Sequence, residues 1–228
     1  YLQSSKPLKP WREKCKIIPL GLDTGRLPDV TASETEGLWP GNGLRVLAIG
    51  RLTYYKGFDT LIRAVAGTHD MQLVIVGEGD ERAVLEGVLA RAGNPAQIRL
   101  AGQVDDACCQ RLLASCDVFC LPSRERTEAF GIVLMEAMRY GKPLLASRLE
   151  GSGVVWVVED GRNGRLVPPD DPLAWREALT ALAADPHRRR ELGDAGRRRF
   201  EREFDIIRTA GRLSTLYAAT SRRDCAAE

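Results

Sequence analysis

The chain has 228 residues, of which 44% are hydrophobic and 28% are charged, and its formal net charge is +2 at pH 7. This length allows one large domain, or one domain with appendages, and the composition is ordinary for a globular protein. The small net charge argues against a nucleic-acid binder, and no apolar run approaches the about 18 residues that a membrane-spanning helix needs.

The cysteines favour a reduced, cytoplasmic protein. They occupy six positions, Cys15, Cys108, Cys109, Cys116, Cys120 and Cys225. This spacing contains no C-x-x-C pair and indicates neither a zinc site nor a disulfide framework. We interpret these residues as small buried hydrophobes, which is the usual role of cysteine in a reducing compartment. The first residues do not resemble a signal peptide.

Residues 1–43 differ in composition from the rest of the chain. The apolar run 16–23 predicts a short strand ended by turn residues, and the polar stretch 31–43 predicts a loop. We interpret residues 1–43 as an interdomain linker and lead-in, and we expect the chain to begin in the middle of a longer protein.

From residue 44 onward, strand patterns alternate with helix patterns. Apolar runs predict strands over 45–50, 72–76, 98–101, 118–121, 143–146 and 164–167. Helical spacing predicts helices over 58–66, 81–91, 105–115, 131–140, 172–184, 186–203 and 206–219. Such alternation predicts an α/β fold, with a parallel sheet covered by helices on both faces, in which ligands bind beyond the carboxyl ends of the strands.

Those strand ends are rich in glycine and polar residues. Gly50, Gly77, Gly79 and Gly102 follow three successive strands, and 122–124 (Pro-Ser-Arg) follow the fourth. Glycine at these points allows the backbone to approach a ligand closely, although glycine also ends strands for purely structural reasons. The Gly-Glu-Gly run at 77–79 begins like a dinucleotide fingerprint. Arg82 occupies its third glycine position, which argues against a dehydrogenase.

The central stretch 126–137 carries two carboxylates, Glu128 and Glu136, eight residues apart. If the span between them is mostly helical, they lie about 12 Å apart along the axis and about 80° apart around it, so that both face one cleft. That separation suits the two ends of an elongated polar ligand. The amides of Phe130, Gly131 and Ile132 lie at the helix start, where an anion is favoured. A nucleotide sugar fits this pattern, and an amphipathic helix with two solvated glutamates is the alternative.

Two cations follow the first strand of the domain. Arg51 and Lys56 lie in a loop that leads into a helix. Arginine can bind phosphate oxygens with two parallel hydrogen bonds, and lysine supplies a point charge, although a solvated basic loop is the alternative interpretation. His69 and His187, the only histidines, lie outside any motif and are interpreted as surface residues rather than bases.

With these motifs placed, the sequence resembles the nucleotide-sugar-binding half of the retaining glycosyltransferases of family 4, which have the GT-B fold. The order of the motifs carries the resemblance, from about residue 16 to residue 217. They are residues 17–23, 50–52 with 56–57, 76–79, 102–104, 117–123, 128–131 with 136–137, 141–143, and 160–161 with 166–169. The resemblance implies a Rossmann-like donor-binding domain over 44–203. It also implies that the helix within 204–228 returns toward an N-terminal domain outside this chain.

The resemblance also implies roles for individual residues. Arg51 and Lys56 would bind the diphosphate of a UDP- or GDP-sugar and stabilise the leaving nucleotide without a metal or other cofactor. Glu136 would bind the ribose hydroxyls and Glu128 the transferred sugar. The amides of Phe130, Gly131 and Ile132 would line the diphosphate site, and Gly102 and Val104 would lie near the base. Of these residues, Glu128, Arg51 and Lys56 would be catalytic.

The implied reaction transfers a sugar, with retained anomeric configuration, to a saccharide or lipid-linked acceptor bound by the N-terminal domain. We expect such an enzyme to act in cell-surface polysaccharide or glycolipid synthesis, in the cytoplasm or at the inner face of the membrane, and we expect this chain alone to be inactive. Residues 150–157 depart from the family's Gly-Gly-x-Pro-Glu segment, because no Glu follows and Trp156 stands nearby. The alternatives are another GT-B enzyme, such as a sugar-nucleotide epimerase, and a non-catalytic nucleotide-sugar-binding module.

Overall fold

Six parallel strands form a single sheet in the computed structural model, which describes residues 5–23, 30, 32–35, 37–93 and 95–224. The strands are β1 (Leu44–Ile49), β2 (Met71–Val76), β3 (Ile98–Gly102), β4 (Val118–Leu121), β5 (Leu144–Ser147) and β6 (Gly164–Val167). Their order in the sheet is β3-β2-β1-β4-β5-β6, and every pairing is parallel. The predicted Rossmann-like parallel sheet is confirmed.

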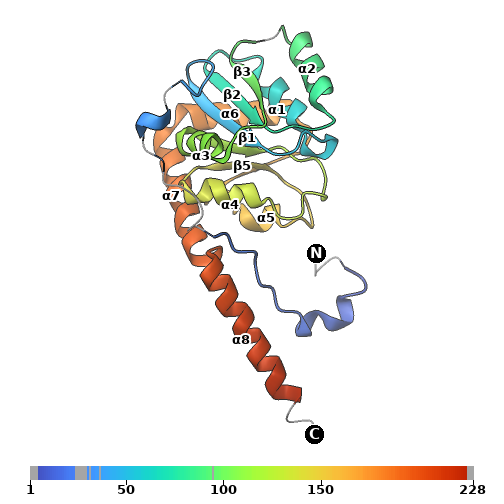
Figure 1. The fold of residues 1–228 in the computed structure, drawn as a ribbon. Helices are drawn as coiled ribbons and strands as arrows, with labels where there is room; N and C mark the ends of the chain where they lie inside the picture. Colours follow the sequence, from blue (N-terminus) through green and yellow to red (C-terminus); the bar gives the residue numbers. More distant parts are fainter. Residues whose placement is uncertain (1–4, 24–29, 31, 36, 94, 225–228) are drawn as a thin grey trace.

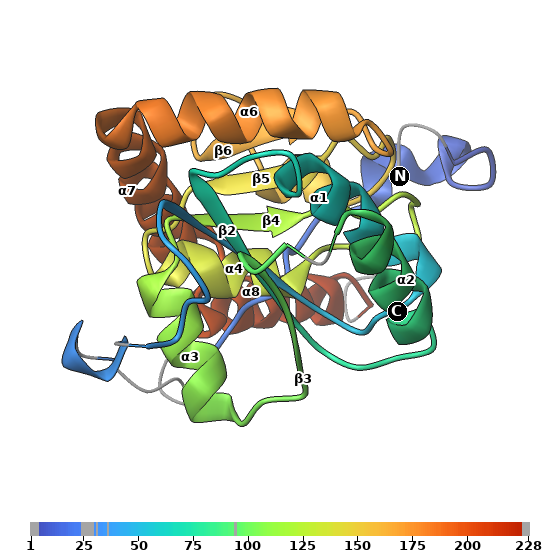
Figure 2. The same cartoon turned by 90° about the horizontal axis from the view of Figure 1, so that it is seen from above.

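Helices cover both faces of this sheet, as the alternation of patterns predicts (Figure 2). One face carries α1 (Phe58–Val65), α2 (Arg82–Arg91) and α6 (Pro172–Ala184). The other face carries α3 (Asp106–Ser115), α4 (Ile132–Arg139) and the short α5 (Val154–Val157). The long helix α7 (Pro186–Glu203) contributes Leu192 to the core of the first face and Phe200 to that of the second, so it joins the two layers.

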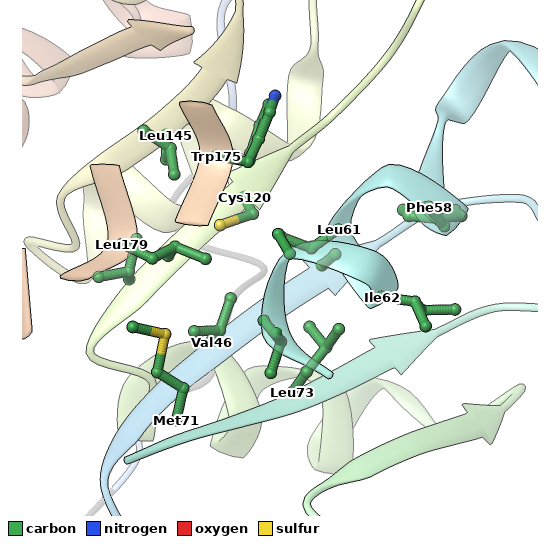
Figure 3. Packing of buried hydrophobic residues seen from close by; sticks show 14 of the residues in the cluster. Val46, Phe58, Leu61, Ile62, Met71, Leu73, Cys120, Leu145, Trp175 and Leu179 are labelled. Carbon is green, nitrogen blue, oxygen red and sulfur yellow. The ribbon is translucent and has the colours of Figure 1, made fainter. Parts of the chain in front are cut away.

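The core under α1 and α6 is built from residues that alternate along the central strands. Val46 of β1, Leu73 of β2, Leu61 of α1 and Trp175 of α6 all belong to this core, and their side chains are buried (Figure 3). The indole Nε1 of Trp175 donates to the carbonyl oxygen of Pro168 at 3.1 Å. This hydrogen bond satisfies the one polar group that the buried ring brings into the core.

The core on the opposite face places α4 directly beneath the sheet. Leu134, Met135 and Met138 of α4 pack with Phe119 of β4, and all are buried. The expected burial is seen at Cys116 and Cys120, and burial raises the pKa of the Cys116 thiol to about 12. The other three described cysteines, Cys15, Cys108 and Cys109, are only partly buried. Because α4 includes the second half of the candidate ligand-binding stretch 126–137, this packing fixes the position of that stretch against the sheet.

The segments before β1 differ in part from the predictions. The predicted strand over 16–23 is wrong, because Leu22 forms only an isolated bridge with Asp205 and no neighbouring strand within the described residues pairs with the rest of the run. The predicted loop over 31–43 contains a short 3-10 turn at Ala32–Thr35, while residues 31 and 36 lie outside the described residues. The sequence analysis also missed α5, which at four residues is too short to show a helical period.

The last helix, α8 (Ile206–Asp224), projects away from the sheet and its covering helices (Figure 1). Its first turn is tied to the segment before β1, since the amide of Ile206 donates to the carbonyl oxygen of Leu22 at 3.2 Å. In the described part of the chain, no helix is both long enough and apolar enough to cross a membrane. The division into 1–43, 44–203 and 204–228 stays a prediction.

Candidate functional site

The strand order places a topological switch point between β1 and β4. The chain leaves β1 toward α1 on one face of the sheet and leaves β4 toward α4 on the other face. The loops that follow these two neighbouring strands therefore diverge at the carboxyl edge, which is the topological switch point where open α/β sheets bind ligands. The loop 50–57 follows β1, and the loop 122–131 follows β4.

A buried ion pair joins these two loops. The Nζ of Lys56 lies 2.6 Å from Oε2 of Glu128, and the two residues are 9% and 8% exposed. The hydroxyl of Ser123, which is fully buried, donates to the same Oε2 at 3.0 Å. Both hydrogen bonds use one carboxylate oxygen, so within the described residues Oε1 of Glu128 accepts none.

Arg51 differs from Lys56 in its surroundings. Its side chain is exposed and makes no ion pair or hydrogen bond within the part of the chain that the structure describes. Lys56 instead lies against Gly50, where a Cβ would stand 3.3 Å from the ammonium nitrogen. The loop after β1 therefore offers one cation fixed by Glu128 and one, Arg51, that has no partner among the described residues.

The start of α4 presents unused backbone donors beside the ion pair. Gly131 caps the helix in the left-handed conformation, at a φ of 74°, and no side chain caps the helix. Among the described residues, the amides of Phe130, Gly131 and Ile132 donate no hydrogen bond to another protein atom. Free amides at a helix N-terminus attract an anion, because the first turn leaves its donors unsatisfied and the helix dipole is positive there.

Glu136 lies one turn further along α4 and is partly buried. Burial raises the pKa of its carboxyl group, and the charge of Asp106 on α3 raises it further. The neighbouring thiol of Cys109 has a pKa raised to about 11 by its own burial and by the charge of Glu136. Within the described residues, Glu136 makes no ion pair and accepts no hydrogen bond. A desolvated carboxylate without a donor is costly unless a ligand supplies one.

The expected 12 Å helical spacing of the two carboxylates does not apply. α4 begins at Ile132, so Glu128 lies four residues before the helix, in the turn that follows β4. The glycines after the strands also have a structural role. A Cβ on Gly77, whose φ is 140°, would stand 2.0 Å from the carbonyl oxygen of Gly50, so this glycine lets two loops pack together.

Gly102 is the last residue of β3 and Val104 follows it; β3 lies two strands away from β1 in the sheet. The carbonyl oxygen of Gly102 accepts from the amide of Gly77 at 2.9 Å, and Val104 packs half-buried on the core of the α4 face. They line the same edge of the sheet as Lys56 and Glu128. The structure thus brings Lys56 and Glu128 into direct contact and places Gly102 and Val104 further along that edge.

The segment 150–157, which departs from the family pattern, supports the turn before α4. The hydroxyl of Ser152 donates to the carbonyl oxygen of Glu128, and the amide of Gly153 donates to that of Ala129 at 2.7 Å. Trp156 packs on Phe130, with ring centroids 6.1 Å apart. Sequence reasoning missed Ser152 as a support, because its partner is a backbone atom 24 residues away.

Ser123 and Arg124 were also missed as functional residues. The sequence shows them only as polar residues at the end of a predicted strand. In the structure, Ser123 holds Glu128, and Arg124 forms ion pairs with Asp59 and Asp170. The available signal was their position immediately after an apolar strand, at the edge where ligands of a parallel sheet bind.

Histidines and metal-binding groups do not contribute to this site. His69 and His187 are both exposed, as expected for surface residues. Among the described residues, no group of three or more His, Cys, Asp and Glu side chains is placed to hold a metal ion. In the described part of the chain, the candidate site therefore consists of the ion pair, the guanidinium of Arg51, the amides at the start of α4 and the carboxylate of Glu136.

An open parallel sheet with this strand order, and with a polar site at its switch point, defines a Rossmann-like α/β domain with a ligand site at the carboxyl edge. Residues 29–199 match the family described as "Glycosyl transferases group 1". The chain belongs to this family.

Individual relatives agree with this assignment. The chain is 35% identical over 205 residues to the D-rhamnosyltransferase WbpZ of Pseudomonas aeruginosa, an alignment that covers 90% of this chain and 53% of the relative. It is 34% identical over 236 residues to a phosphatidyl-myo-inositol mannosyltransferase of Mycobacterium leprae, covering 92% of this chain and 61% of the relative. The chain thus spans little more than half the length of these two relatives.

Solved structures show the same fold. The sucrose-phosphate synthase of Thermosynechococcus elongatus superposes with a TM-score of 0.80 and is 31% identical in sequence. The superposition covers 97% of this chain and 56% of that protein. This similarity confirms the expected architecture, one Rossmann-like half of a GT-B glycosyltransferase.

Proposed function

We propose that this chain binds the nucleotide-diphosphate-sugar donor of a retaining glycosyltransferase of family 4. The observation that carries the proposal is the arrangement at the switch point between β1 and β4. There a buried Lys56–Glu128 pair lies beside free amides at the start of α4, and an unpartnered Glu136 lies on the same helix. Cationic and amide donors suit a diphosphate, and carboxylate acceptors suit hydroxyl groups.

The diphosphate would lie between the loop after β1 and the start of α4. The ammonium group of Lys56 has three N–H donors. One donates to Glu128, so two remain to donate to phosphate oxygens. Arg51, exposed and without a partner among the described residues, would close on the outer phosphate. The amides of Phe130, Gly131 and Ile132 would donate from the other side. As the nucleotide leaves, these donors stabilise the charge that develops on the diphosphate, without a metal ion or other cofactor.

The two carboxylates would hold the hydroxyl groups at the two ends of the donor. Glu136 would accept hydrogen bonds from the ribose, which would supply the partners that its desolvated carboxylate lacks. Oε1 of Glu128 would accept from the transferred sugar, because Oε2 is already used by Lys56 and Ser123. Gly102 and Val104 would lie near the base. In this arrangement Lys56 and Glu128 fix each other's position before the donor binds.

The whole enzyme would transfer the sugar from a UDP- or GDP-sugar to a saccharide or lipid-linked acceptor with retention of configuration. The acceptor would be held by an N-terminal domain toward which α8 returns, so we expect this chain alone to be inactive. The relatives include a rhamnosyltransferase and a phosphatidyl-myo-inositol mannosyltransferase, which supports a role in cell-surface polysaccharide or glycolipid synthesis. We place this activity in the cytoplasm or at the inner face of the membrane.

Calorimetric titration of the chain with UDP, GDP and ADP in the presence of EDTA tests the donor site. We expect one diphosphate to bind with a clear preference and chelation to leave its affinity unchanged. Glu136→Gln should weaken that binding by about 1–3 kcal/mol, the value of hydrogen bonds to a charged group. Glu177→Gln, an exposed change on α6 at the opposite face, is the matched control and should leave the affinity unchanged.

Equal affinity in the Glu136→Gln variant would contradict the assignment of the ribose site. Loss of binding on adding EDTA would contradict the metal-independent site. A product assay on a longer protein that includes the acceptor domain would separate a transferase from an epimerase, because an epimerase converts the donor without an acceptor.

A further inference from the structure

We propose that Arg124 is a positioning residue that holds Lys56 in place for the donor diphosphate. The inference rests on the proposed function, and it concerns a residue to which that function assigns no contact with the donor. Arg124 stands immediately after Ser123, in the loop between β4 and α4, and its side chain is only 13% exposed.

Arg124 makes three contacts with the turn that carries Lys56. Its backbone amide donates to the carbonyl oxygen of Tyr55 at 2.7 Å, and its NH1 donates to that of Tyr54 at 3.2 Å. Its guanidinium also lies over the ring of Tyr54, 4.8 Å from the centroid. The two residues that precede Lys56 are thus both fixed by Arg124, and the short 3-10 turn Tyr54–Lys56 cannot shift without breaking these contacts.

The other side of the guanidinium is anchored to the body of the domain. NH2 of Arg124 lies 2.5 Å from a carboxylate oxygen of Asp59, in the first turn of α1, and Asp59 is 9% exposed. Nε donates to Asp170, in the loop after β6. Arg124 therefore links the Tyr54–Lys56 turn to helix α1 and to the loop that follows β6.

Asp170 accepts from Arg124 while its backbone has an uncommon conformation. It is the one non-glycine residue with a positive φ among those described, at 55°. Aspartate tolerates this left-handed conformation better than most residues. The conformation directs its carboxylate to Arg124, and the hydroxyl of Thr60 lies 3.4 Å from the same oxygen.

The loop after β4 therefore positions both members of the ion pair. Ser123 holds the carboxylate of Glu128 directly, and Arg124 holds the turn of Lys56. Because the two supports are adjacent in sequence, the relative placement of cation and carboxylate depends on one short loop. A small displacement of such groups costs binding and rate, since their effect depends on preorganised geometry.

The test compares Arg124→Gln with Arg63→Gln. Arg63 also forms an ion pair with Asp59, at 2.8 Å, but it is half-exposed and has no contact with the Tyr54–Lys56 turn among those described. Affinity is measured by calorimetry for UDP or GDP, whichever the unaltered chain binds more tightly, and for the matching nucleoside monophosphate. Arg124→Lys is a second variant, which keeps the charge but lacks the planar fork whose three nitrogens donate to Asp59, Asp170 and Tyr54.

We expect Arg124→Gln to lower the diphosphate affinity on the order of 10-fold, within the range of coupled neighbouring residues, and the monophosphate affinity by less. The diphosphate affinity of Arg124→Lys should lie between those of Arg124→Gln and the unaltered chain, and the affinity of Arg63→Gln should equal that of the unaltered chain. In a Lys56→Met background, Arg124→Gln should cause little further loss, because the residue acts through Lys56.

Three results would overturn the inference. They are an unchanged diphosphate affinity in both Arg124 variants, an equal loss for diphosphate and monophosphate, and full additivity with Lys56→Met. If the unaltered chain bound no nucleoside diphosphate, the proposed function would fail and the inference with it. Binding by the unaltered chain together with any of the three results would overturn the inference alone.

Discussion

The Nζ of Lys56 and Oε2 of Glu128 lie 2.6 Å apart, although the two residues are 72 positions apart in the chain. Both side chains are almost completely buried, at 11% and 10% exposed, so the pair is shielded from water and from salt. Removing one partner of such a pair leaves an uncompensated buried charge, whereas removing both leaves none. This asymmetry makes the pair testable by stability measurements that need no ligand.

Lys56→Met should lower the free energy of unfolding by about 3–5 kcal/mol, the usual cost of breaking a buried pair. The double variant Lys56→Met with Glu128→Gln should recover much of this loss, since no unpaired charge remains. Urea unfolding of the single and double variants measures the coupling. Additive losses would show that the two side chains do not interact in solution.

Glu136→Gln should make the chain more stable while it weakens nucleotide binding. The pKa of Glu136 is raised by burial, so its ionised form is disfavoured in the folded state and its contribution to stability falls as pH rises through the range between the unfolded and folded pKa. A neutral amide removes this cost. We expect a melting temperature higher by about 1–2 °C at pH 7, as a few tenths of a kcal/mol give in a domain of this size.

The higher melting temperature of Glu136→Gln should disappear at acidic pH. Below the unfolded pKa, Glu136 is protonated in both the folded and the unfolded state. Thermal melts at pH 3.5 and pH 7 measure this difference. An equal gain at both values would contradict the assignment of the effect to the carboxylate charge.

Ser123→Ala and Ser147→Ala should differ, although both serines are fully buried. Ser123 donates to the carboxylate of Glu128, whereas the hydroxyl of Ser147 has no hydrogen-bond partner among the described residues. Losing a hydrogen bond to a charged group should cost about 1.5–3 kcal/mol, and deleting an unpaired hydroxyl should be nearly neutral. Denaturant unfolding of the two variants makes the comparison, and equal costs would argue against the Ser123–Glu128 bond.

Gly131→Ala should destabilise the chain more than Gly161→Ala. Both glycines have a φ of 74°, which costs an alanine about 1–2 kcal/mol. A Cβ on Gly161 meets nothing within 4 Å, but one on Gly131 would stand 2.8 Å from Leu134 and 2.9 Å from Leu121. We therefore expect the Gly131 variant to lose about 1 kcal/mol more free energy of unfolding than the Gly161 variant, because of overpacking. Unfolding curves give the difference, and only the Gly131 change should also reduce nucleotide affinity.

The sequence by itself determined the architecture. The six strand runs and the helical spacings between them are local patterns, so β4, β6, α6 and α7 begin and end at the predicted residues. The strand predicted over 16–23 failed for the opposite reason. An apolar run becomes a strand only where another strand is available to pair with it, and Leu22 finds only an isolated bridge.

The candidate site residues were predicted from the order of the motifs, which does not depend on geometry, and their roles stay predictions. The distances and contacts between these residues were decided only by the tertiary structure. The expected helical spacing of Glu128 and Glu136 was wrong, since Gly131 delays the start of α4 until Ile132. The contact of Lys56 with Glu128, and the support of its turn by Arg124, join loops that the sheet order brings together. Local patterns carry no information on such contacts, because they arise when parallel strands distant in sequence become neighbours.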